Sequence, residues 1–109
     1  MAYDEGLAER VRDLLALHGD VSERKMFGGI AWMASGNMAC GVMGDELIVR
    51  LGPEESERAL AEPHTRRFDF TGKPLKGFVC VGPEATAEPK HLAGWVEAGL
   101  GFAGSLPAK

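Results

Sequence analysis

The chain has 109 residues, 45% of them hydrophobic and 26% charged, with a formal net charge of −4. This length predicts a single domain over residues 1–109, large enough to form a core without a metal or a disulfide. The acidic balance disfavours non-specific nucleic-acid binding, which depends on neutralising phosphates, and every apolar run is too short to cross a bilayer. Because the N-terminus lacks the layout of a signal peptide, we expect a cytoplasmic protein.

An amphipathic helix is the first element expected, over residues 4 to 18. Asp4 is placed to cap its start, and Gly19 is placed to end it in a left-handed conformation. Apolar side chains recur between them at helical spacing: Leu7, Val11, Leu14 and Leu15. This apolar stripe needs a sheet or another helix to cover it.

Three strands joined by tight turns are expected next. The first covers residues 26 to 33 and has no polar side chain on either face, a pattern typical of a central strand covered on both sides by helices or by a partner subunit. Ser35-Gly36-Asn37 forms a turn, since Gly and Asn tolerate positive φ. The second and third strands follow over residues 38 to 43 and 46 to 51.

The remaining sequence predicts a helix, two strands and a closing helix, over residues 53 to 61, 66 to 70, 78 to 81 and 88 to 106. The closing helix contains four glycines, each costing about 1 kcal/mol relative to alanine. This helix therefore packs very closely on a neighbour or frays in its C-terminal half. The expected fold class is α+β, a five-stranded antiparallel sheet flanked by helices in the order α-β-β-β-α-β-β-α.

No residue pattern predicts catalysis, a cofactor or a metal site. The G-x-G-x-x-G sequence at residues 99 to 104 follows a helix, whereas a dinucleotide site needs a preceding strand. The three histidines lie in different segments and lack metal-ligand spacing with one another or with the cysteines. Cys40 and Cys80 form a redox pair or are small buried thiols, and their apolar surroundings favour the second interpretation. We therefore expect a protein that is not an enzyme.

Two features indicate a binding surface. The methionines of the central stretch, with Trp32, either fill the core or form an adaptable contact surface. The cations of the sheet half are either solvated strand ends or one basic rim suited to an acidic partner or to phosphate: Arg24, Lys25, Arg50, Arg66, Arg67, Lys73 and Lys76. The candidate partner-binding residues are Arg24, Lys25, Met26, Phe27, Trp32 and Arg50.

The central stretch resembles the N-terminal domain of the TfoX/Sxy family, whose members regulate natural competence in bacteria. The resemblance rests on Lys25-Met26-Phe27-Gly28-Gly29-Ile30, Gly36-Asn37-Met38 and Gly41, and it extends over about residues 5 to 106. It implies a curved antiparallel sheet flanked by helices, similar to secretion chaperones. The chain departs from full-length competence regulators, which carry a second, C-terminal domain, so we expect a stand-alone domain.

Gly28, Gly29, Gly36, Asn37 and Gly41 are interpreted as structural residues of this motif. Two glycines inside a strand mark a bulge or a close approach of another backbone, and Gly36-Asn37 satisfies a hairpin turn. The motif therefore predicts backbone geometry and does not by itself predict a binding site.

The expected function is regulation, of competence or transcription by resemblance, through contact with an unidentified protein partner. The doubly apolar first strand leads us to expect a homodimer. One alternative is a nucleic-acid-associated regulator that uses the basic rim. Another is a small-molecule-binding module between the sheet and the last helix, where the glycines leave room.

Overall fold

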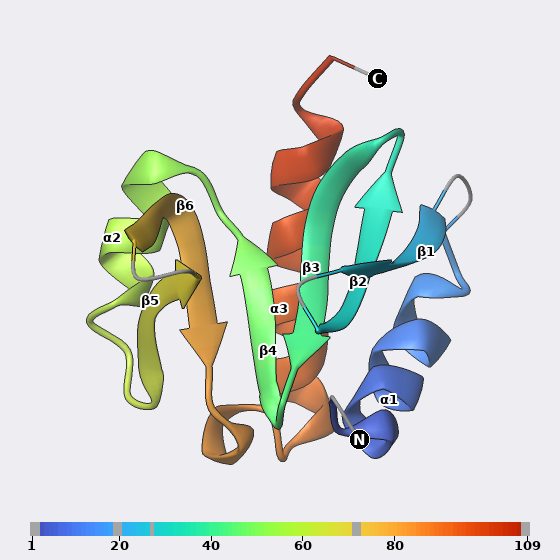
Figure 1. Cartoon of the computed structure of the whole chain (residues 1–109), viewed down its shortest axis with the longest axis horizontal. Coiled ribbons are helices and arrows are strands. Elements are labelled where there is room, and N and C mark those ends of the chain that lie inside the picture. Colours follow the sequence, from blue (N-terminus) through green and yellow to red (C-terminus); the bar gives the residue numbers. More distant parts are fainter. Residues whose placement is uncertain (1–2, 19–20, 27, 71–72, 108–109) are drawn as a thin grey trace.

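A six-stranded antiparallel sheet with three α-helices forms the fold of the computed structural model (Figure 1), which describes residues 3–18, 21–26, 28–70 and 73–107. The elements in chain order are α1 (Glu5–Leu15), β1 (Val21–Met26), β2 (Gly29–Ala34), β3 (Asn37–Met43), β4 (Glu46–Arg50), α2 (Pro53–Ala59), β5 (Thr65–Phe70), β6 (Lys73–Val81), the 3-10 turn η1 (Pro83–Ala85) and α3 (Pro89–Gly104). This arrangement confirms the predicted α+β class and the predicted helices.

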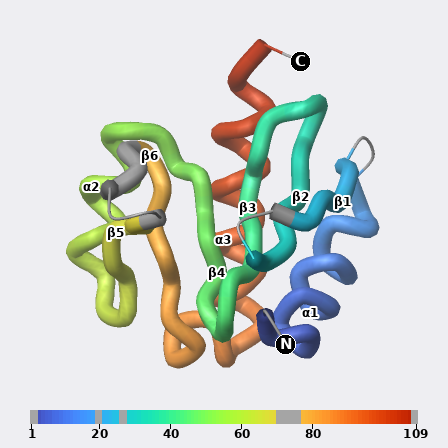
Figure 2. Tube along the Cα trace, viewed as in Figure 1, coloured from blue at the N-terminus to red at the C-terminus, as the bar shows by residue number. Residues whose placement is uncertain are grey.

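The strand order across the sheet is β1-β2-β3-β4-β6-β5, with every neighbouring pair antiparallel. The chain passes from β4 through α2 to the edge strand β5 and then returns as β6 beside β4, a path that can be followed in Figure 2. β1 and β5 therefore form the two opposite edges of the sheet.

The predicted five strands were one too few, because β1 is absent from the prediction. Its sequence, VSERKM, is dominated by polar side chains, and charged residues are a common feature of edge strands, where they discourage pairing with another chain. The predicted first strand over residues 26 to 33 is also too long. Gly28 has φ +74°, and Met26 pairs with Gly29 across this turn, so the β2 strand begins only at Gly29.

The motif glycines Gly28, Gly29 and Gly36 lie at turns or close backbone contacts, whereas Asn37, expected in the hairpin turn, is the first residue of β3. Ser35 and Gly36 both have positive φ, 51° and 85°, as a tight hairpin turn requires. A Cβ atom on Gly29 would lie 2.2 Å from the carbonyl oxygen of Val42, so this position allows the backbones of β2 and β3 to approach closely. Gly41 lies in the centre of the sheet opposite Ala31.

The helices cover one face of the sheet. α3 runs behind β3 and β4 in Figure 1 and packs on both, while α2 packs on β6. Asp4 caps α1 by accepting a hydrogen bond from the Leu7 backbone N–H (3.1 Å), as predicted, although α1 ends at Leu15. The main core lies between these layers and includes Val11, Leu47 and Val96, all at most 1% exposed.

A second, smaller apolar cluster lies on the opposite face of the sheet, which we call the outer face. Its buried members are Ala31, Met38, Ile48, Phe68 and Cys80, and the partly buried Met33, Met43 and Phe78 pack against them. All of these residues belong to strands, and none belongs to a helix. Within the described part of the chain, no helix therefore packs on this cluster, which consists of side chains of the sheet itself.

Candidate functional site

The outer face collects three of the four methionines that the sequence singled out. Met33 and Met43 are partly buried, Met38 is 8% exposed, and all three pack in the same cluster. The side chain of Met26, the fourth, lies outside what the structure describes. Flexible thioether side chains fit irregular partner surfaces well, and Met33 and Met43 are the two of these methionines that remain partly exposed.

Trp32 faces the other way, into the core beneath the helices. Its side chain is 2% exposed, and its indole N–H donates to Glu23 Oε1 at 3.1 Å. Arg12 of α1 donates to both oxygens of the same carboxylate, at 2.7 and 3.2 Å. The hydrogen bonds from Arg12 and then from Trp32 hold the pKa of the Glu23 carboxyl below its ordinary value, against the opposing effect of burial. Trp32 is therefore a core residue and not a surface residue, and through Glu23 it links β1 and α1 to the core.

Arg24 and Lys25 are exposed neighbours on β1. They project to opposite faces of the sheet because side chains alternate along a strand. Arg24 pairs with Ala31, a member of the outer-face cluster, whereas Lys25 pairs with Ile30 of the main core. Arg24 is thus the residue of this pair that borders the outer face, and it has no ion pair with another described residue.

Arg50 lies at the end of β4 between two aromatic rings. Its guanidinium carbon is 5.5 Å from the ring centroid of Phe78, on the outer face, and 5.5 Å from that of Phe102 on α3. These distances are within the range of cation–π attraction. Arg50 therefore has a fixed position at the margin of the outer face while its side chain remains partly exposed.

The other cations do not join these two in a continuous rim. Arg66 and Arg67 lie on β5, at the sheet edge opposite β1. Arg66 forms an ion pair with Glu46, and Arg67 pairs with Glu57. The side chains of Lys73 and Lys76, and Phe27 altogether, lie outside the described residues. The positive charge described on the outer face therefore comes from Arg24 and Arg50, which lie apart, and from Arg66, which is paired with Glu46.

Both cysteines are buried free thiols in opposite layers of the protein, Cys40 in the main core and Cys80 in the outer-face cluster. Burial raises the pKa of the Cys40 thiol to about 12 and that of Cys80 to about 11. The thiolate is the reactive form, so these groups are protonated and inert near neutral pH.

We expect both thiols of the folded protein to resist a disulfide-exchange reagent at pH 7. Both should react within seconds once the chain is unfolded in guanidinium chloride, because their pKa values then return to about 8.5. Absorbance of the released thiolate measures the reaction. Immediate reaction of one thiol in the native protein would contradict its burial.

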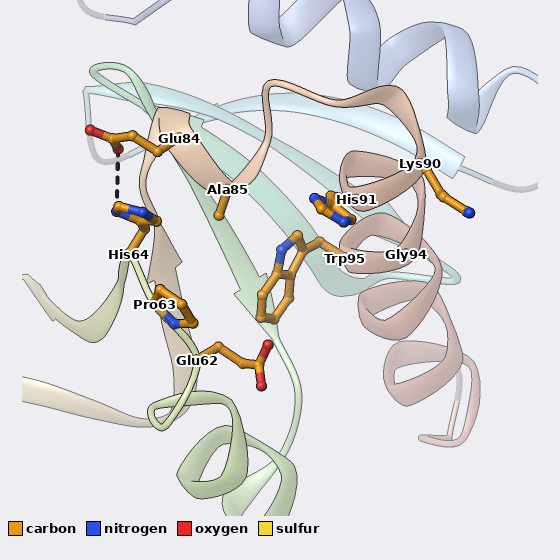
Figure 3. Close-up of a pocket in the computed structure, with 9 residues that line it drawn as sticks. All are labelled: Glu62, Pro63, His64, Glu84, Ala85, Lys90, His91, Gly94 and Trp95. Carbon is orange, nitrogen blue, oxygen red and sulfur yellow. Dashed lines mark ion pairs between the residues drawn. The ribbon is translucent and has the colours of Figure 1, made fainter.

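A groove of about 410 Å³ lies near the start of α3 (Figure 3). It is lined by three segments that are distant in the sequence: residues 62–64 before β5, residues 84 and 85 of η1, and residues 90, 91, 94 and 95 of α3. Of the closing-helix glycines, Gly94 lines this groove, whereas Gly99 packs against the Ala39 backbone. The space expected between the sheet and the closing helix is thus not found beside Gly99, and the groove lies instead at the N-terminal end of α3.

The sequence did not predict the groove, since its three segments carry no shared motif. The sequence placed His64 and His91 in different segments without metal-ligand spacing, and the structure brings both to this groove. His64 has φ +64°, a conformation uncommon in non-glycine residues, and its Nδ1 lies 3.8 Å from Glu84 Oε1. No group of three or more potential metal ligands occurs among the residues that the structure describes. No described helix is long and apolar enough to cross a membrane.

A family model described as the TfoX N-terminal domain matches residues 13–103. No curated protein matches the sequence significantly. The matched range contains all six strands, α2 and nearly all of α3.

Proposed function

Because the chain belongs to the TfoX N-terminal domain family, we propose that it is a regulatory protein without catalytic activity that acts by binding a protein partner through its outer face. Competence or transcription is the process that the family suggests. The two free, buried cysteines fit a reducing compartment, and a cytoplasmic site of action is part of this proposal.

The outer-face cluster is the observation that supports a protein partner. It presents partly exposed Met33, Met43 and Phe78 around a buried centre, and described residues of the helices do not pack on it. Arg24 and Arg50 stand at its margin. Adaptable apolar side chains with arginine at the border are typical of protein-binding surfaces.

Affinity capture from the native lysate tests this proposal. A double variant, Arg24→Ala with Met43→Ala, removes one cation at the margin of the outer face and one apolar contact within it. Arg58→Ala is the matched control, because this exposed arginine lies on α2, away from the outer face. A partner bound through the outer face should be recovered at least about tenfold less by the double variant, a loss typical of two contact residues. The control should recover it as the wild type does, and equal recovery by all three proteins would refute the proposal.

Nucleic acid is the second candidate partner, by way of the arginines of the sheet. The net charge of −4 and the ion pairs at Arg66 and Arg67 weigh against it. Nuclease treatment and a second salt concentration in the same capture distinguish the two. Recovery that disappears with nuclease, or that falls steeply with salt, would favour this candidate.

A homodimer remains part of the proposal, but its reason changes with the structure. The predicted strand over residues 26 to 33, which led us to expect the dimer, is divided by a turn at Gly28. A second copy would therefore pack on the outer face around Met33. Light scattering at micromolar concentration should give twice the monomer mass if the outer face pairs with itself. The double variant should then shift the mass to that of the monomer.

A further inference from the structure

The groove at the start of α3 has the size and lining of a small-ligand site. Its volume of about 410 Å³ lies within the roughly 300–1,000 Å³ of known ligand pockets. The Trp95 ring projects into it from α3, and Pro63 and Ala85 form the apolar wall across from the ring (Figure 3). Nothing lies within 4 Å of where a Cβ of Gly94 would be, so the helix leaves open space beside the indole.

The charges in the groove favour a cation. The Glu62 carboxylate points towards Trp95 in Figure 3, and no described residue forms an ion pair with it. Lys90, the lysine of the lining, points away from the ring in the same view. Glu84 is the second carboxylate, directed to His64 at the far end of the groove. Among the described residues, the Glu62 carboxylate beside the indole therefore has no cation that neutralises it.

We propose that this groove binds a small organic cation, with the charged nitrogen on the Trp95 ring and near the Glu62 carboxylate. An indole is the strongest aromatic partner for a cation, and quaternary ammonium groups bind to such rings in aromatic cages. Pro63 and Ala85 supply apolar contact for the methyl or methylene groups that surround the charge. This site is separate from the outer face and does not depend on the proposed function.

Choline and its neutral isostere 3,3-dimethylbutan-1-ol are the probes that test the proposal. The two molecules have nearly the same shape and differ in charge. Choline at roughly 1–10 mM, the range for one cation–π contact and one ion pair, should shift the indole N–H resonance of Trp95. The resonance of Trp32 should stay in place, because that indole is in the core. The neutral alcohol should bind at least about fivefold more weakly.

Two variants keep the fold and change the groove. Glu62→Gln removes the charge from an exposed side chain and should lower the affinity for choline about fivefold. Gly94→Ala fills the open space, should lower the affinity further, and should not destabilise the helix, because alanine is the better helix former. Glu97→Gln is the control, an exposed carboxylate of the same helix outside the groove, and should bind choline as the wild type does.

Three results would overturn the proposal. One is equal binding of choline and its neutral isostere. Another is the absence of any Trp95 shift at 10 mM choline, about the weakest affinity that the groove chemistry allows. The third is a loss of affinity in Glu97→Gln as large as that in Glu62→Gln, since this would reflect the overall charge of the protein and not the groove.

Discussion

Replacing Trp32 with alanine should lower the free energy of unfolding by about 3–5 kcal/mol, the usual cost of removing a buried aromatic side chain. The indole is 2% exposed and lies in the main core with Val11 and Val42. Its loss leaves a cavity and also removes a donor to the Glu23 carboxylate, which is held at the same time by Arg12. A domain of this size has a total stability of about 5–15 kcal/mol, so this variant should lose a large share of its stability.

Urea denaturation followed by circular dichroism measures the effect. Trp32→Phe serves as the companion variant, since it keeps most of the volume and loses the hydrogen bond, at an expected cost of about 1–2 kcal/mol. A residue that only contacts a partner would behave differently, because a surface substitution changes stability by less than about 0.5 kcal/mol. A loss below 1 kcal/mol in Trp32→Ala would therefore contradict the core position of this side chain.

Replacing Gly99 with alanine should destabilise the protein by about 2–3 kcal/mol, the upper part of the range for overpacking a core. A Cβ on Gly99 would lie 2.4 Å from the carbonyl oxygen of Ala39 and 3.3 Å from a Val49 methyl. The first contact is with backbone in the middle of β3, which cannot move without disturbing the sheet. Helix propensity alone predicts the opposite result, a gain of about 1 kcal/mol.

Gly101→Ala is the matched control for this prediction. Gly101 lies two residues further along α3, and no atom lies within 4 Å of where its Cβ would be. Alanine there should stabilise the protein by up to about 1 kcal/mol. Thermal unfolding of the two variants should therefore shift in opposite directions. A stabilised Gly99→Ala variant would mean that α3 does not pack on β3 as closely as described.

The features of the fold that could be predicted from the sequence depend on local patterns. Helical spacing from Leu7 to Leu15 indicated α1, and Ser35-Gly36 indicated the hairpin turn between β2 and β3. The edge strand β1 could not be predicted in this way. Its Glu-Arg-Lys sequence has no apolar alternation, and β1 is held by pairing with β2 and by the bonds of Glu23 to α1 and Trp32.

Alternation along a strand could be predicted from the sequence, but not which of the two sets of side chains faces the helices. A shift of one residue moves a side chain to the other side of a sheet, and the register of β2 and β3 changes between Trp32 and Met33. Trp32 and Met33 lie on opposite faces because side chains alternate along β2, and the changed pairing places Met38 opposite Met33 in the outer-face cluster. The sequence left open whether Trp32 and the methionines fill the core or form one contact surface, and the structure places Trp32 in the main core and three of the methionines in the outer-face cluster.

The groove could not be predicted from the sequence either, because its residues are distant from one another along the chain. Glu62, Ala85 and Trp95 meet because α3 begins beside the turn that precedes β5, an arrangement that follows from the whole sheet. The pattern of each segment alone is that of an ordinary loop or helix face. Of the candidate partner residues, Arg24 and Arg50 border the outer face, and Trp32 belongs to the core.

The most direct test of the proposed function is a methyl NMR spectrum of methionine-labelled protein, recorded with and without the captured partner. Partner binding through the outer face should shift or broaden the Met33 and Met43 methyl resonances, since these side chains form the partly exposed part of the cluster. The Trp95 indole resonance, in the groove at the start of α3, should stay unchanged. A partner that binds while the Met33 and Met43 signals remain in place would contradict the assignment of the outer face as the binding surface.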